Sequence, residues 1–167
     1  VGYIVRLLEF ASENGLSVLP WGAGTHQGLG RTIEPDIVVV TTRLAEVEDW
    51  QPDDLTIVAG AGTTLGSLDA LMADRRQGAV LPEDQPAATI GGIVASGGSG
   101  WRRLRYGPTR ARMLATTVVT GDGRVVRGGA RVVKNVTGYD VPRLMAGSLG
   151  SLGIIVSVCL KLWPDPE

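Results

Sequence analysis

The sequence predicts an α+β fold in which two α/β lobes form one domain of 167 residues. The length is that of a single domain. Helix and strand patterns alternate in the first part, whereas the second part has the pattern of a helix, a hairpin and a long strand. We expect lobe one at residues 1–66 and lobe two at residues 67–167, with the join between about Gly60 and Gly78.

Helices are predicted where apolar residues recur at helical spacing. Asn14-Gly15 is a typical helix end, and Thr64 or Ser67 can cap a helix start. Small and apolar residues alternate after Thr89, as in a helix packed closely on a flat surface. The expected helices span residues 4–14, 64–78 and 90–96, with a short one at 141–145.

Strands are predicted where apolar or β-branched residues run together. Ile37–Val40 has the pattern of a buried strand, and Gly121-Asp122-Gly123 predicts a hairpin turn. Pro164 is expected to end the last strand, and Val80 to Pro82 to be extended. The expected strands span residues 16–20, 37–40, 47–50, 56–59, 114–120, 124–127 and 154–162.

The composition excludes several classes of site. The chain is 44% hydrophobic and 20% charged with a net charge of -1, which argues against a nucleic-acid binder. Cys159 is the only cysteine and His26 the only histidine, so there is no internal disulfide and little material for a metal site or a Ser-His-Asp triad. Cys159 lies in a predicted strand, where we expect a small buried side chain.

The sequence shows no pattern typical of targeting. No apolar run approaches the roughly 20 residues of a membrane span, and the first residues do not have the pattern of a signal peptide. The first residue is Val1 rather than methionine, which suggests a piece of a longer protein. We expect a cytoplasmic location and leave open an association with a membrane-bound complex.

Three glycine-rich turns, each at the end of an apolar run, are the most informative feature. They span residues 22–30, 89–100 and 147–153. Glycine exposes main-chain N–H groups and admits a phosphate, ribose or flat ring at close range. The first turn has G-x-G-x-x-x-G spacing and no lysine, so it is neither a Rossmann fingerprint nor a P-loop. The second precedes a helix whose N-terminal N–H groups would suit an anion. Alone, each is also compatible with a purely structural turn; together they predict one long, phosphate-bearing cofactor.

The motifs occur in an order that resembles a known family. They are Pro20-Trp21-Gly22-Ala23-Gly24-Thr25, Ala88-Thr89-Ile90-Gly91-Gly92, Arg105-Tyr106-Gly107, Lys134-Asn135-Val136-Thr137-Gly138-Tyr139-Asp140 and Gly147-Ser148-Leu149-Gly150-Ser151-Leu152-Gly153-Ile154-Ile155. This series resembles the FAD-binding domain of the vanillyl-alcohol oxidase and p-cresol methylhydroxylase (PCMH-type) family. Within it, residues 131–164 are most similar to the small FAD-binding subunit of bacterial glycolate oxidases, which are FAD-linked oxidases.

The resemblance implies FAD, held across both lobes. Residues 22–27 would cradle the pyrophosphate, residues 89–92 and 95–97 would line the ribityl chain and flavin, and residues 147–154 would pack on the adenine side. It implies no metal, and no catalytic residue is assigned. The implied cofactor-binding residues are Gly22, Ala23, Gly24, Thr25, His26, Gln27, Gly28, Pro82, Thr89, Ile90, Gly91, Gly92, Ala95, Ser96, Gly97, Tyr106, Gly147, Gly150, Gly153 and Ile154.

Two departures from the family pattern limit what the resemblance implies. Some members attach FAD covalently to a histidine of the first loop, but Thr25 stands at that position and His26 is one residue further on, so we expect non-covalent FAD. We also expect that the family's first strand is missing before Val1 and that its substrate-binding domain would begin where the sequence ends at Glu167.

Two function classes remain open at this point. The resemblance implies a component of an oxidoreductase that acts on a 2-hydroxy acid such as glycolate or D-lactate. The alternative is a module that carries FAD for a catalytic partner, which the few acid–base residues favour. The implied partners are a larger flavoprotein subunit and an iron–sulfur subunit. An NAD-dependent enzyme does not fit the glycine spacing.

Two further segments have several interpretations. Residues 101–112 hold five arginines, which favours a solvated loop first, a phosphate or carboxylate clamp second and a subunit interface third. Asp140 is expected to accept main-chain hydrogen bonds in a turn, and Tyr139 to pack on the second lobe.

Overall fold

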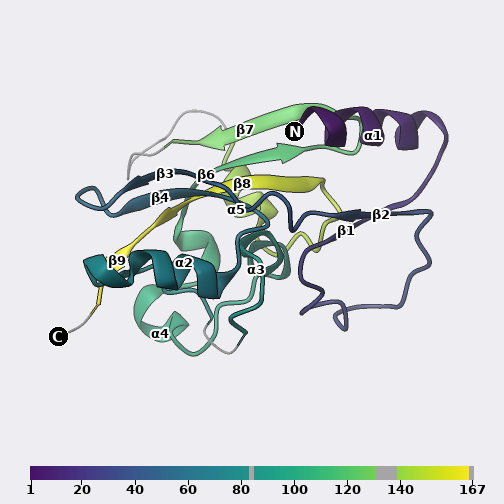
Figure 1. Cartoon of the computed structure of the whole chain (residues 1–167). Coiled ribbons are helices and arrows are strands. Elements are labelled where there is room, and N and C mark those ends of the chain that lie inside the picture. Colours follow the sequence, from purple (N-terminus) through teal and green to yellow (C-terminus); the bar gives the residue numbers. More distant parts are fainter. Residues whose placement is uncertain (83–84, 131–138, 166–167) are drawn as a thin grey trace.

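The computed structural model describes residues 1–82, 85–130 and 139–165 and shows an α+β fold (Figure 1). The helices are α1 (Gly2–Glu13), α2 (Leu65–Met72), α3 (Ile90–Ser96), α4 (Arg103–Tyr106) and α5 (Val141–Met145), with short 3-10 turns at Ala73–Arg75 and Thr109–Ala111. The strands are β1 (Val18–Trp21), β2 (Ile37–Val40), β3 (Val47–Gln51), β4 (Thr56–Gly60), β5 (Gln77–Gly78), β6 (Met113–Val119), β7 (Val125–Gly129), β8 (Ile154–Lys161) and β9 (Trp163–Pro164).

The largest sheet is antiparallel and has the order β3-β4-β8-β6-β7. Its central strand β8 pairs with β4 through Val58↔Cys159 and with β6 through Ala115↔Cys159, which buries Cys159 as expected. Strands β1 and β2 form a separate parallel pair, and β5 pairs with β9. Because β3 and β4 share the large sheet with β6 to β8, strands on both sides of the expected join at residues 66 and 67 belong to one sheet.

The main core lies between this sheet and helices α2 and α3. Both helices begin at a threonine whose hydroxyl accepts a main-chain hydrogen bond, Thr64 from Ser67 and Thr89 from Gly92, each at 3.2 Å. Their apolar side chains are buried in one cluster with those of β4, β6 and β8. The residues of this core include Ile57, Ala59, Leu65, Leu68, Met72, Ile90, Ile93, Val94, Val118, Val158 and Leu160.

A second core joins the parallel pair to the end of the large sheet. Helix α1 contributes Ile4 and Leu8, which pack with Val39, Ile154 and Val156. Ile154 and Val156 therefore tie the start of β8 to α1 and β2. Figure 1 shows α1 on the side of the sheet opposite α2 and α4. No helix in the described ranges is long and apolar enough to cross a membrane.

Four expectations about local structure are wrong. The helix from Thr64 ends at Met72 rather than near Gly78, because residues 77–78 leave it to pair with β9. Val80 has a φ of 54°, so it is not extended. Strand β2 is buried only at Val39, because α1 covers just one of its faces. Pro164 does not stop the long strand, because β8 already ends at Lys161 and Pro164 is the last residue of the short strand β9.

Arg112 also departs from the expected solvated loop. Its side chain is fully buried and donates hydrogen bonds to the carbonyl oxygens of Val80 and, at 2.7 Å, of Gly107. Burial lowers the pKa of this guanidinium, and the charge of Arg102 lowers it further. The guanidinium of Arg112 thus connects the loops at residues 80 and 107 by hydrogen bonds to both.

Candidate functional site

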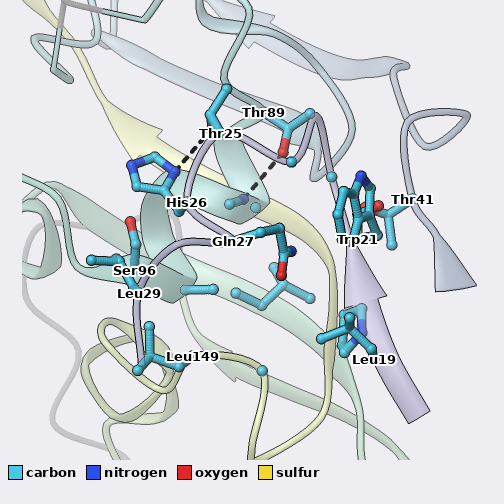
Figure 2. Close-up of a pocket in the computed structure, with 18 of the residues that line it drawn as sticks. Leu19, Trp21, Thr25, His26, Gln27, Leu29, Thr41, Thr89, Ser96 and Leu149 are labelled. Carbon is cyan, nitrogen blue, oxygen red and sulfur yellow. Dashed lines mark hydrogen bonds between the residues drawn. The ribbon is translucent and has the colours of Figure 1, made fainter. Parts of the chain in front are cut away.

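A pocket of about 460 Å³ lies where the three glycine-rich turns meet (Figure 2). That volume is within the range of cofactor sites. Its walls are the end of β1 with the following loop, the start of α3, and the turn before β8. Of the sequence-predicted residues, it is lined by Gly22, Ala23, Gly24, Thr25, His26, Gln27, Thr89, Gly91, Gly92, Ala95, Ser96, Gly150, Gly153 and Ile154.

The first turn offers unpaired main-chain donors to this pocket. In the described part of the chain, none of the N–H groups from Gly22 to His26 donates a hydrogen bond. The turn resumes internal bonding only at Gln27, whose N–H reaches the Gly24 carbonyl at 3.4 Å. Gly24 has a φ of 76°, a left-handed conformation that glycine adopts without steric cost. A series of free N–H groups in such a turn is a concave site for an anion.

The second turn does not offer the donors that its sequence predicts. The N–H groups of Ile90 and Gly91 donate to the carbonyls of Thr63 and Ala61 at 2.9 and 2.8 Å. The N–H of Gly92 donates to Thr89 Oγ1. The expectation of exposed donors at this helix start is therefore wrong, because the strand-to-helix connection after β4 and the capping threonine use them.

The second turn instead lets other segments approach closely. A Cβ on Gly22 would overlap Thr89 Oγ1, so the first and second turns are in direct contact. A Cβ on Gly91 would lie 2.8 Å from the Ala61 Cβ, so α3 sits against the end of β4. Gly22 and Gly91 are therefore required because other protein segments pack against them. This packing positions the wall of the pocket.

The third turn closes the pocket from the other side. The Leu149 N–H donates to the Ala95 carbonyl at 2.8 Å, and the Gly147 N–H donates to the Val94 carbonyl at 3.0 Å. A Cβ on Gly150 would lie 3.3 Å from the Pro20 ring. The third turn thus contacts both the end of α3 and strand β1, and the pocket is framed by backbone on three sides.

Six predicted residues do not line the pocket. Ile90 is fully buried in the core, and Gly97 and Gly147 pack on each other, since a Cβ on Gly97 would lie 3.2 Å from the Gly147 Cα. Pro82 lies against Gly98 and Gly100. The Tyr106 ring packs edge-on against the Trp163 ring, with 5.6 Å between the ring centroids. A Cβ on Gly28 would have no other segment within 4 Å, so this glycine lies in open space.

The pocket also contains residues that the sequence did not indicate. Leu19, Trp21, Leu29 and Thr41 line it together with Arg31, which adds a positive charge. Trp21 packs on Gly24, since a Cβ there would lie 2.8 Å from the indole ring. Trp21 lies within the Pro20-to-Thr25 motif, directly before Gly22. This position in the sequence could have identified it as a pocket residue. No local sequence pattern identifies Leu19, Arg31 and Thr41 as pocket residues, because the fold brings them to the pocket from different segments.

The electrostatics of the pocket favour an anionic ligand. Among the described residues that line it, none is Asp or Glu, and Arg31 and His26 are the basic side chains. His26 Nδ1 lies 3.0 Å from Thr25 Oγ1 (Figure 2), which fixes one ring nitrogen at the first turn. In the described ranges, no three His, Cys, Asp or Glu side chains cluster as metal ligands.

Comparison with known proteins identifies the family to which the chain belongs. Residues 2–129 match the family described as FAD binding domain. The chain belongs to this family. The resemblance inferred from the glycine-rich turns is thereby confirmed, and FAD is the cofactor.

Relatives extend the match over nearly the whole chain. A D-lactate dehydrogenase of Archaeoglobus fulgidus is 35% identical over 97% of this chain and 37% of its own length. Glycolate oxidase subunit GlcD of Bacillus subtilis is 33% identical over 98% of this chain and 35% of its own length. Glycolate oxidase subunit GlcE of Escherichia coli is 37% identical over 87% of this chain and 42% of its own length. The chain thus spans well under half the length of these relatives.

The residues present fit FAD. The dinucleotide carries a diphosphate, for which the unpaired N–H groups of Gly22 to His26 provide donors without a competing carboxylate among the described lining residues. The flat rings and ribityl chain need an apolar surface open to close approach, which Trp21, Ala95 and the glycines supply.

Proposed function

We propose that this chain is the FAD-binding part of an oxidoreductase that acts on a 2-hydroxy acid such as glycolate or D-lactate. The observation that carries the proposal is the first turn, whose five successive N–H groups border the pocket without protein partners in the described ranges. The family match supports FAD as the occupant. Relatives named D-lactate dehydrogenase and glycolate oxidase subunits support the substrate class.

Each turn has its own part in holding the cofactor. The first turn holds the diphosphate through its N–H groups, assisted by the positive charge of Arg31. The second turn, at Thr89 and Ala95, lies along the ribityl chain and flavin, and the third turn at Gly150 and Gly153 lies on the adenine side. FAD would then extend between the two predicted lobes, because the first turn belongs to lobe one and the second and third turns belong to lobe two.

We infer that FAD is held without a covalent bond. By the resemblance, Thr25 stands where the family's attachment histidine would be, and His26 Nδ1 lies 3.0 Å from Thr25 Oγ1. Main-chain donors and close packing are reversible contacts, so denaturation would release the cofactor.

The chain itself contributes binding and orientation. When bound, FAD supplies the two-electron chemistry by which a 2-hydroxy acid becomes a 2-oxo acid. No Asp or Glu of the described residues lines the pocket, so the proton of the substrate hydroxyl has no carboxylate base from this wall. His26 is held at the first turn, beside the proposed diphosphate donors and away from the flavin, so we infer that a further part of the enzyme covers the flavin and supplies the base.

A second candidate function is an accessory subunit that carries FAD for a catalytic partner. Its specific support is that two relatives bear subunit names. Of the three relatives described above, the Escherichia coli subunit has the largest share of its length covered. A larger flavoprotein subunit and an iron–sulfur subunit would be the partners, in a cytoplasmic complex that can associate with a membrane.

Anaerobic reduction separates the two functions. The FAD-loaded chain is mixed with D-lactate or glycolate, and flavin absorbance near 450 nm is followed. Bleaching once the part of the enzyme that covers the flavin is present, at a rate that saturates with substrate, supports the oxidoreductase, whereas rapid bleaching by the chain alone contradicts the inference that the base lies elsewhere. Bleaching only after the partner subunits are added supports the accessory function. A chain that takes up no FAD at all contradicts both.

A further inference from the structure

The short helix α4 and the residues beside it expose two large apolar side chains. Trp101 is 77% exposed and Leu104 is 98% exposed. Isolated apolar residues on a surface are common and need no explanation. These two lie within one turn of chain, however, and Leu104 has almost no contact with the rest of the protein.

Arginines surround these apolar side chains. Arg102, Arg103, Arg105 and Arg110 lie in the same segment, and residues 101–112 include no Asp or Glu. The Arg102 guanidinium lies 5.6 Å from the centre of the Trp101 ring, as in a cation–π pair. We refer to Trp101, Arg102, Arg103, Leu104, Arg105 and Arg110 as the α4 surface.

The base of the α4 surface is held rigidly by buried polar groups. Thr109 donates its N–H to Ser99 Oγ at 3.0 Å and its hydroxyl to the Gly98 carbonyl, and the side chains of Thr109 and Ser99 are buried. Buried Arg112 holds the Gly107 carbonyl at the end of α4 at 2.7 Å. The exposed side chains therefore project from a fixed backbone, so a partner would not have to order this loop.

The α4 surface is separate from the cofactor pocket. None of residues 101–112 lines that pocket. In Figure 1, α4 and the long loop after β1 lie on opposite sides of α3.

We propose that the α4 surface is a docking site for a protein segment in which apolar side chains lie among carboxylates. Trp and Arg are the residues that most often dominate protein interfaces, usually as apolar anchors in a polar rim. The positive charges of Arg103, Arg105 and Arg110 call for an acidic partner. A protein fits better than a nucleic acid, because the basic residues occupy one short turn rather than a groove, and the chain as a whole has a net charge of -1.

The test uses a probe with this chemistry: a capped peptide of about a dozen residues, all glutamate except for Leu and Phe at its centre. It is titrated into the isotope-labelled chain, and the Trp101 indole N–H and the α4 amides are followed by NMR. We expect saturable shifts at these signals that weaken as salt is raised. No shift at Trp101, or equal shifts with a lysine version of the peptide, would overturn the proposal.

Variants identify the contact. Trp101→Ala with Leu104→Ser should weaken peptide binding at least tenfold, whereas Tyr3→Ala, which removes a 72% exposed aromatic ring from α1, should leave it unchanged. Arg103→Glu with Arg105→Glu should transfer the preference to the lysine peptide. FAD content of every variant should equal that of the wild type, which shows that the fold is intact. Tighter binding of a thymidine oligonucleotide or of anionic phospholipid vesicles than of the acidic peptide would also overturn the proposal.

Discussion

Replacing Gly22 with alanine tests the contact that brings the first two turns together. The added Cβ would overlap Thr89 Oγ1 and lie 3.4 Å from Thr89 Cβ. Gly22 is not among the glycines with positive φ, so alanine suits its backbone and the cost is steric. Overpacking of this kind costs about 1–3 kcal/mol. If the turns move apart to relieve it, FAD affinity falls by about 5- to 150-fold.

A double-mutant cycle separates this contact from a general loss of stability. Thr89→Ala removes Oγ1 and with it the cap of α3, at a cost of about 1 kcal/mol. Because it also removes the atom that an alanine at residue 22 would overlap, the double variant should bind FAD more tightly than the sum of the single effects predicts. FAD affinity is measured from flavin fluorescence, and stability from thermal unfolding.

Gly28 offers a matched control, because it is a glycine of the same turn with open space around it. Gly28→Ala adds a Cβ with nothing within 4 Å, so its FAD affinity should match the wild type. If Gly22→Ala binds as tightly as Gly28→Ala, the two turns do not meet as described. If the effects of Gly22→Ala and Thr89→Ala add within about 0.5 kcal/mol, the clash with Oγ1 is not the cause.

Three further predictions address cofactor attachment, packing and pH. Acid precipitation should leave all flavin in the supernatant, and flavin in the protein pellet would disprove non-covalent binding. Gly91→Ala should lower the unfolding temperature of the FAD-free chain as well as the FAD content, because its Cβ meets Ala61; loss of FAD at unchanged stability would instead assign Gly91 to the cofactor. Hydrogen bonds from the Ser17 hydroxyl and N–H lower the pKa of Asp36 below its ordinary 3.8, so its charge stabilises the fold above that pH and the effect is lost as pH falls through the folded-state pKa. Asp36→Asn should therefore be less stable than wild type at neutral pH, with a difference in unfolding temperature that shrinks below about pH 3.8; a constant difference would contradict this origin.

Local signals in the sequence predicted most elements correctly. Thr64 caps α2, and residues 121–123 turn the β6–β7 hairpin, because these structures depend on neighbouring residues. Asp140 likewise caps α5 by accepting the Arg143 N–H at 3.1 Å.

Features set by contacts between distant segments could not be predicted in this way. Exposed donors at the start of α3 were expected, but the carbonyls of Ala61 and Thr63, far back in the chain, accept those bonds. Arg112 is one of five arginines in an expected solvated loop, yet the carbonyls of Val80 and Gly107 hold it inside the protein. Tyr139 was expected to pack on the second lobe, whereas the structure leaves it exposed.

The central claim is that the N–H groups of the first turn bind the FAD diphosphate, and amide NMR tests it most directly. ADP, which carries the diphosphate without the flavin, is titrated into the labelled FAD-free chain, with riboflavin as the phosphate-free control. We predict that ADP shifts the amide signals of residues 22–26 and that riboflavin leaves them in place. Unchanged signals at residues 22–26 while FAD itself binds would contradict the claim.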